Sequence, residues 1–235
     1  MDTIYSVTDE LKKLLLTNGA DIVGIGDLTE LPETVRYGLS VGISIAVKYP
    51  KEIIRGISEF PTQEYFNWYT SLNNQLDALV SLGAEFLENR GYRAVAKTRA
   101  EVGRYSKECT TTLPHKTVAT RAGIGWIGKS ALLITRQYGS MVRLSSILTN
   151  APLITAEPVN SSQCGNCNIC QNTCPAKAIH GMLWNVSVLR DELIDYQRCS
   201  QTAQLRSEQS FGKRIEICGK CIEVCPYTKR YLNQQ

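Results

Sequence analysis

Eight cysteines near the end of the chain have the spacing of ligands to iron–sulfur clusters. They lie in two similar runs, Cys164-x-x-Cys167-x-x-Cys170-x-x-x-Cys174-Pro175 and Cys218-x-x-Cys221-x-x-x-Cys225-Pro226, with Cys199 between them. Two-residue gaps let the backbone wrap around one cubane and present thiolates to its irons. The proline that ends each run prevents an uninterrupted helix. The chemistry that these residues indicate is electron transfer.

The two runs predict how the cysteines are shared between clusters. In two-cluster bacterial ferredoxins, three cysteines of such a run bind one cluster and the fourth binds the other. The second run lacks a cysteine at its front, and Cys199 supplies that ligand. By analogy, one 4Fe-4S cluster is bound by Cys164, Cys167, Cys170 and Cys225, and the other by Cys174, Cys199, Cys218 and Cys221. The alternative is structural zinc, because two Cys-x-x-Cys pairs can form a zinc site.

Three further residues are candidates for chemistry. Cys109 is a candidate reactive thiol or substrate contact, and the alternative is a small buried residue. His115, next to Lys116, is a candidate proton donor or anion contact, and the alternative is a capping or packing role. His180 follows the first cysteine run, and a structural role is expected for it.

Composition bounds the class of protein. The 235 residues are 43% hydrophobic and 20% charged, as in a globular protein with a packed core. The formal net charge is +4, but two thiolate-bound clusters of roughly −2 each would bring it near zero. The charge therefore says little for nucleic-acid binding. No apolar stretch approaches the roughly 18 residues of a membrane helix, and no signal peptide is apparent, so a cytoplasmic protein is expected.

The elements that must position these residues are predicted from periodicity. Apolar residues at helical spacing predict helices, and apolar runs next to glycine predict strands. The expected helices are 9–17, 61–90 and 114–122, and the expected strands are 20–25, 41–47, 92–96, 131–135 and 142–148. We predict an α/β (α+β) domain over residues 1–152, with helices covering a central sheet, and a ferredoxin-like domain with two clusters over residues 153–235.

A glycine string lies between the expected helix 114–122 and the following strand. Gly123-x-Gly125-x-x-Gly128 matches the dinucleotide-binding pattern, but that pattern should follow a strand. The acidic residue expected about 20 residues later is also missing. Nicotinamide binding is therefore rejected.

The segment from Pro114 to Ser130, together with the cysteine order after it, resembles epoxyqueuosine reductases, which are related to reductive dehalogenases. The resemblance extends from Asn18 to Pro226 and is to a short form without the C-terminal helical-repeat domain. It implies that the first domain binds cobalamin and that the clusters pass electrons to it. Counting back about 17 residues from Trp126, Cys109 stands where these enzymes carry an aspartate proton donor.

The resemblance also implies site residues. Cys109 and His115 are the implied catalytic residues, and the implied cofactor-binding residues are Lys116, Gly123, Gly125, Trp126, Gly128 and Lys129. The main hypothesis is an iron–sulfur oxidoreductase whose clusters serve a corrinoid or another small acceptor, with a donor such as ferredoxin or flavodoxin. Two alternatives stay open. One is a non-catalytic electron carrier or activator of a partner corrinoid protein, and the other is a queuosine-modification reductase acting on tRNA.

Overall fold

The computed structural model describes residues 4–102 and 111–234. Contacts divide the chain into two compact units, each assembled from three separate segments. The first unit comprises residues 1–47, 72–124 and 143–159, and the second comprises residues 48–71, 125–142 and 160–235. The sequence-based boundary between residues 152 and 153 stays a prediction, since these units are not separated by a single cut of the chain.

The first unit contains a four-stranded sheet. Its strand order is β1 (Ile22–Asp27), β2 (Val41–Lys48), β6 (Val142–Thr149) and β3 (Ala94–Ala96). Strands β1 and β2 are antiparallel, with Ile22 opposite Ala46, and β3 and β6 are antiparallel, with Ala94 opposite Thr149. Strand β2 is buried along nearly its whole length, as expected of a strand covered on both faces.

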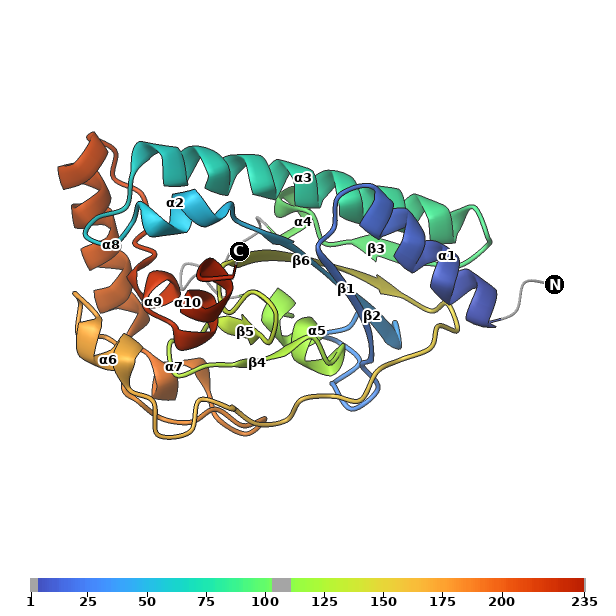
Figure 1. Ribbon diagram of the computed structural model, residues 1–235. Helices are drawn as coiled ribbons and strands as arrows, with labels where there is room; N and C mark the ends of the chain where they lie inside the picture. The colour runs from blue at the N-terminus through green and yellow to red at the C-terminus, as the bar shows by residue number, and fades with distance from the viewer. Residues whose placement is uncertain (1–3, 103–110, 235) are drawn as a thin grey trace. The chain divides into compact units, whose positions relative to one another are not determined.

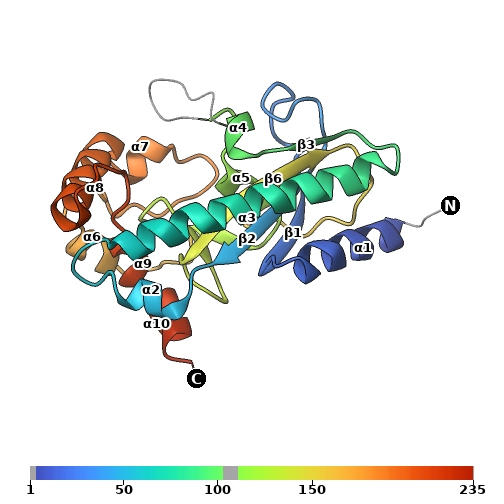
Figure 2. The ribbon, with the colours of Figure 1, turned by 90° about the horizontal axis from the view of Figure 1, so that it is seen from above.

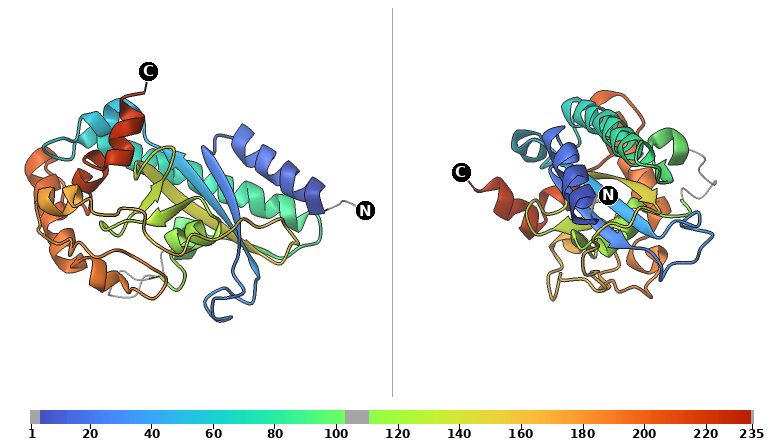
Figure 3. Two further views of the ribbon diagram at one scale, coloured as in Figure 1. Left: turned by 60° about the horizontal axis from the view of Figure 1, so that its bottom comes forward. Right: turned by 90° about the vertical axis from the view of Figure 1, so that its right-hand side faces the viewer.

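Helices cover both faces of this sheet. Helices α1 (Ile4–Thr17) and α3 (Gln63–Glu88) lie on one face, and α5 (His115–Arg121) lies on the other (Figure 1). The glycine at position 83 lets α3 pack closely on the sheet, because a Cβ there would lie 2.5 Å from Cδ1 of Ile147. Glycine 26 of β1 does the same for α5, since its Cβ would lie 2.4 Å from the carbonyl carbon of Arg121. The end-on view shows α1 beside α3 (Figure 3). The predicted helix-covered central sheet is confirmed.

The second unit is built from short elements. Strands β4 (Gly125–Ile127) and β5 (Leu133–Thr135) pair as an antiparallel hairpin. Helix α9 contacts three other helices, α2, α6 and α10 (Figure 2). The helices of this unit are α2 (Lys51–Arg55), α6 (Ile169–Thr173), α7 (Arg190–Leu193), α8 (Tyr196–Phe211), α9 (Lys220–Glu223) and α10 (Pro226–Leu232).

Most predicted elements are present with shifted ends. The first helix begins five residues earlier than expected, at Ile4, and the strand expected over 131–135 covers only Leu133–Thr135. Helix α2, the one-turn helix α4 (Arg99–Val102), strand β4 and the helices α6 to α10 were not predicted. Most of these are seven residues or fewer, too short for periodicity to reveal, and the longer α8 carries few apolar residues. None of the described helices combines the length and apolar composition required to cross a bilayer.

Candidate metal centre

Cysteine sulfurs line a cavity of about 130 Å³ in the second unit. Such a volume exceeds several-fold the space needed for one water molecule. The first cysteine run and the end of the second both contribute to it. Its lining comprises Cys164, Cys167, Cys170, Cys221 and Cys225, together with Lys129, Ser130, Ile134, Gln163, Pro226 and Tyr227.

Electrostatic effects show which thiols are neighbours within this cavity. Burial raises the pKa of Cys170 to about 11, and the nearby Cys164, Cys225 and Cys167 act in the same direction. Since the interaction between charges weakens with distance, a thiol that perturbs another lies close to it. Cys170 therefore sits among the three cysteines that the ferredoxin analogy places on its cluster.

A second group of thiols gathers around Cys199. Burial raises the pKa of Cys199 to about 11, with further contributions from Cys174 and Cys218. Burial also raises the pKa of Cys221 well above its usual range, and Cys218 and Cys199 are its strongest thiol neighbours. Cys170 also acts on Cys221, so the two groups of four adjoin each other.

The cysteine sulfurs surround a cavity and do not converge on the position of a single metal ion. Within residues 4–102 and 111–234, no three His, Cys, Asp or Glu side chains converge closely enough to hold one metal ion. A zinc ion would need sulfurs about 2.3 Å away from a common centre. A cubane instead spreads its thiolate ligands over separate irons. Thiols that line a cavity fit the cluster in their donor chemistry and in their spacing.

The segment after Cys225 supplies backbone donors to the first group. Pro226 occupies the first turn of α10, where a missing N–H is tolerated. The backbone N–H groups of Thr228 and Tyr227 donate to the Cys225 sulfur. They oppose burial, which raises the pKa of this thiol. Thr228 is fully buried, and its Oγ1 accepts a hydrogen bond of 3.1 Å from the backbone N–H of Ser140.

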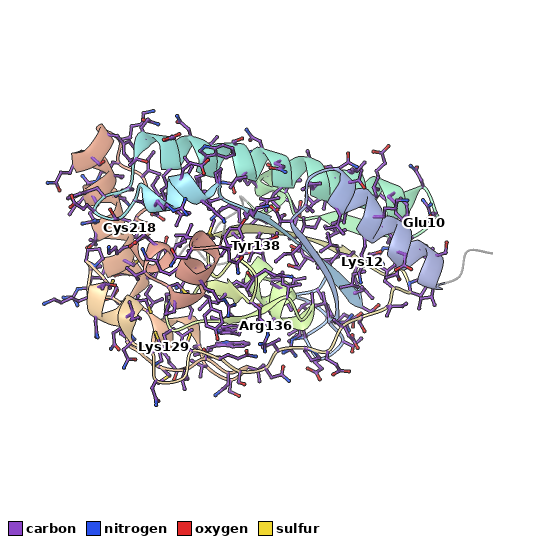
Figure 4. All side chains as sticks on the ribbon, viewed as in Figure 1. Glu10, Lys12, Lys129, Arg136, Tyr138 and Cys218 are labelled. Atoms are coloured by element: carbon purple, nitrogen blue, oxygen red, sulfur yellow. The ribbon has the colours of Figure 1, made fainter. Side chains whose placement is uncertain are left out.

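A tight turn after β4 brings Lys129 to the cavity. The N–H of Ala131 donates to the carbonyl of Gly128 at 2.9 Å, and Ala131 adopts a left-handed φ of 59°. The Lys129 side chain is 5% exposed, and its Nζ donates to Oδ1 of Asn168 at 2.7 Å. Figure 4 labels Lys129 and Cys218 among the side chains of this unit.

The glycines of the string meet local packing needs. Gly123 follows the end of α5 with a left-handed φ of 69°, which is how many helices end. A Cβ on Gly125 would lie 2.2 Å from the carbonyl oxygen of Ile134, across the hairpin. A Cβ on Gly128 would lie 2.4 Å from Cδ1 of Ile134 and 3.4 Å from Sγ of Cys164. These contacts account for the glycines without a corrinoid, and their predicted role in cofactor binding stays a prediction.

Trp126 connects the hairpin with the second cysteine run. It is 1% exposed, and its ring meets the edge of Tyr227 with 4.8 Å between centroids. Tyr227 in turn lines the cavity. In this unit, Trp126 and Lys129 therefore support the region of the first thiol group.

Of the two predicted catalytic residues, His115 belongs to the first unit, and Cys109 is not among the described residues. His115 opens α5 in the first unit, and its Nδ1 lies 2.8 Å from Oγ of Ser146. Burial, with the cations Arg143 and Lys97 nearby, lowers the pKa of His115 to about 4, so its imidazole is neutral at pH 7. Lys116, next in α5, is half-buried. Cys109 lies outside the residues that the structure describes.

Sequence reasoning missed two residues of the site. Asn168, between Cys167 and Cys170, receives the hydrogen bond of Lys129, and Thr228 donates to Cys225. The position of Asn168 within the cysteine run could have identified it as a site residue, because a polar side chain there lies beside the proposed cluster ligands. Thr228 carried no such signal, since its role depends on contacts with distant residues.

Comparison with known proteins agrees with this geometry. Residues 163–228 match the family model of the 4Fe-4S double cluster binding domain. The epoxyqueuosine reductase of Atelocyanobacterium thalassa (isolate ALOHA) is 30% identical over 71% of this chain and 51% of its own length. The chain is epoxyqueuosine reductase-like. Its C-terminal region is a double-cluster 4Fe-4S binding domain, which confirms the second half of the predicted fold.

Solved structures share the fold of this epoxyqueuosine reductase-like chain. An epoxyqueuosine reductase with an epoxyqueuosine-modified stem loop of tyrosine tRNA matches with a TM-score of 0.65 and 21% identity, over 97% of this chain and 66% of its own. A reductive dehalogenase whose structure suggests a mechanism for B12-dependent dehalogenation also matches, with a TM-score of 0.71 and 17% identity. The match covers 92% of this chain and 31% of the dehalogenase chain. The chain thus spans about half of its A. thalassa relative and less of the dehalogenase.

Proposed function

We propose that this protein is an iron–sulfur oxidoreductase that passes electrons through two 4Fe-4S clusters to a cobalamin or another small acceptor bound in its N-terminal part. The observation that carries the proposal is the gathering of eight thiols into two adjoining groups within a double-cluster domain. When bound, such clusters supply reversible one-electron transfer.

The ligand sets of the proposal follow the two thiol groups. Four cysteines of the first group would hold one cluster, and the backbone N–H groups of Tyr227 and Thr228 would stabilise the thiolate of Cys225. The second cluster would be held by the group around Cys199. Because Cys170 and Cys221 are close enough to affect each other, electrons would have a short path between the clusters.

Residues of the first unit would act on the acceptor. His115 would serve as a neutral hydrogen-bonding group, because its low pKa leaves no imidazolium to donate a proton at pH 7. The proton donor of the proposal is therefore Cys109 or water. The choice of cobalamin as the acceptor rests on the resemblance to epoxyqueuosine reductases and reductive dehalogenases.

A tRNA substrate is the second candidate. One observation favours it, the match to an epoxyqueuosine reductase whose structure contains a modified tRNA stem loop. Under this candidate the protein would reduce epoxyqueuosine in tRNA. A steep decline of tRNA affinity with salt would accompany contacts to the phosphates.

Anaerobic purification with iron, sulfide and cobalt analysis tests the proposal, followed by titration with hydroxocobalamin monitored by absorbance. We expect about eight irons per chain and saturable corrinoid binding. About eight irons without corrinoid binding would point instead to an electron carrier or activator of a partner protein. A chain with tightly bound zinc and no sulfide would refute the proposal.

A further inference from the structure

Lys129 is a buried cation beside the first thiol group. Its side chain is 5% exposed and lines the cavity together with Cys164, Cys167, Cys170 and Cys225. The turn closed by the N–H of Ala131 and the carbonyl of Gly128 fixes the backbone from which it extends. Its location is therefore set by the hairpin and does not depend on a flexible loop.

This ammonium has no carboxylate partner in the described part of the chain. The hydrogen bond to Oδ1 of Asn168, at 2.7 Å, is its one polar side-chain contact there. A buried charge is costly unless an opposite charge compensates for it. A cluster held by four thiolates carries a net negative charge and would supply that compensation.

We propose that Lys129 is a positioning residue that provides the counter-charge for the cluster held by Cys164, Cys167, Cys170 and Cys225 and raises its reduction potential. This inference rests on the proposed function, since it requires both clusters to be present. A nearby cation favours the form of the cluster with one more electron, because that form is more negative. Asn168, which lies within the cysteine run, holds the ammonium in place.

The second thiol group has carboxylates near one of its members, Cys199. Glu216 and Asp195 lie close enough to Cys199 to affect its ionisation. Glu216 accepts hydrogen bonds from Tyr196 and Gln204, which keep its carboxylate in place. Carboxylates disfavour an additional electron on a neighbouring cluster.

Potentiometric titration with dithionite, monitored by electron paramagnetic resonance, tests the inference on the holoprotein. Each cluster accepts one electron from the reductant. In Lys129→Met we expect the equilibrium constant for reduction of the cluster beside Lys129 to fall about tenfold. This equals a decrease of about 59 mV in its reduction potential. The other cluster should change by less than twofold. Lys129→Arg, which keeps the charge, should restore most of the potential.

Lys177→Met is the matched control, because it removes a lysine that is exposed to solvent and screened. We expect Lys177→Met to change the reduction equilibrium constant of either cluster by less than twofold. Unchanged potentials in Lys129→Met, with about eight irons retained, would overturn the inference and leave the proposed function intact. Wild-type protein without two clusters would instead refute the proposed function.

A second variant keeps the inference testable if Lys129→Met does not retain its iron. Asn168→Ala preserves the charge but releases the ammonium from its hydrogen bond. We expect the potential of the same cluster to fall by a smaller amount, about threefold in the reduction equilibrium constant. An identical potential in Asn168→Ala and wild type would count against the positioning of Lys129.

Discussion

Gly139 lies directly against the backbone of Thr228. A Cβ atom at Gly139 would be 2.3 Å from the Thr228 nitrogen and 2.4 Å from its Oγ1. The same nitrogen donates to the sulfur of Cys225. A residue far from the cysteine runs in sequence thus controls the position of a donor to the first thiol group.

We expect Gly139→Ala to lose about half of the bound iron, because displacement of Thr228 would disturb only the cluster at Cys225. Gly212→Ala is the matched control. Gly212 has a left-handed φ of 71°, similar to the 59° of Gly139, but nothing lies within 4 Å of its Cβ position. Both variants carry the strain of about 1–2 kcal/mol for a left-handed alanine, and only the first meets a neighbour. Equal iron content in the two variants, measured by chemical analysis, would contradict this account.

Serine variants of the cysteines should separate the two clusters. We expect Cys170→Ser and Cys199→Ser each to lose about four irons and to weaken the brown visible absorption. Because the two residues belong to different thiol groups, the resonance signal that disappears should differ between them. Loss of the same signal in both variants would show that the ligand sets are wrong.

Cys109→Ser provides the corresponding control outside the cluster runs. We expect its iron and sulfide content to equal that of the wild type, since the eight other cysteines complete two sets of four. A loss of about half the iron would identify Cys109 as a ligand.

The sequence was informative where chemistry depends on local spacing. The cysteine runs are compact, so their spacing and the ferredoxin analogy predicted two ligand sets, and this assignment stays a prediction. Longer elements such as α3 were also predicted, because an apolar stripe over many residues has a clear period. The double-cluster domain was predicted from the same local signal.

The remaining features depend on contacts between distant residues. Each compact unit combines segments that are separated in sequence, which no local pattern encodes. The hydrogen bond from Lys129 to Asn168 joins a hairpin turn to a cysteine run, and no spacing rule relates them. The glycine string was interpreted as a cofactor motif, whereas its three glycines also satisfy a helix end and close contacts with Ile134. Sequence alone could not weigh these two explanations.

Acid should destabilise the protein through His115. Its folded-state pKa is about 4, below the ordinary value of about 6.5, so the unfolded state binds the proton first as the pH falls. The native state therefore loses stability below pH 6.5, on the order of 1–2 kcal/mol by pH 5. In His115→Asn this loss should be absent, so the stability difference between wild type and variant should shrink between pH 7 and pH 5.

Denaturant unfolding under anaerobic conditions, followed by circular dichroism, measures this difference. His180→Asn, at an exposed position, controls for the loss of a histidine. A constant difference between wild type and His115→Asn from pH 7 to pH 5 would argue against a buried neutral imidazole.

Glu223 should stabilise the second cysteine run through two lysines. It is 5% exposed on α9, and it is paired with Lys229 and with Lys220, whose Nζ lies 3.1 Å from Oε2. Burial pushes the pKa of this carboxyl up, but the two lysines outweigh it and hold the pKa below its usual range. Its contribution is therefore present above the ordinary carboxyl pKa of about 4.3 and is lost as the pH falls further.

We expect Glu223→Gln to lower the free energy of unfolding by about 1–3 kcal/mol at pH 7, because both lysines lose their charged partner. Glu208→Gln is the matched control, since Glu208 pairs with Arg214 at 3.9 Å and both side chains are exposed. Exposed pairs of this kind contribute at most about 1 kcal/mol. In the double variant with Lys229→Met, the two effects should be less than additive, because each substitution already breaks the same pair. Additive losses would mean that Glu223 acts on the cysteine run through contacts other than Lys229.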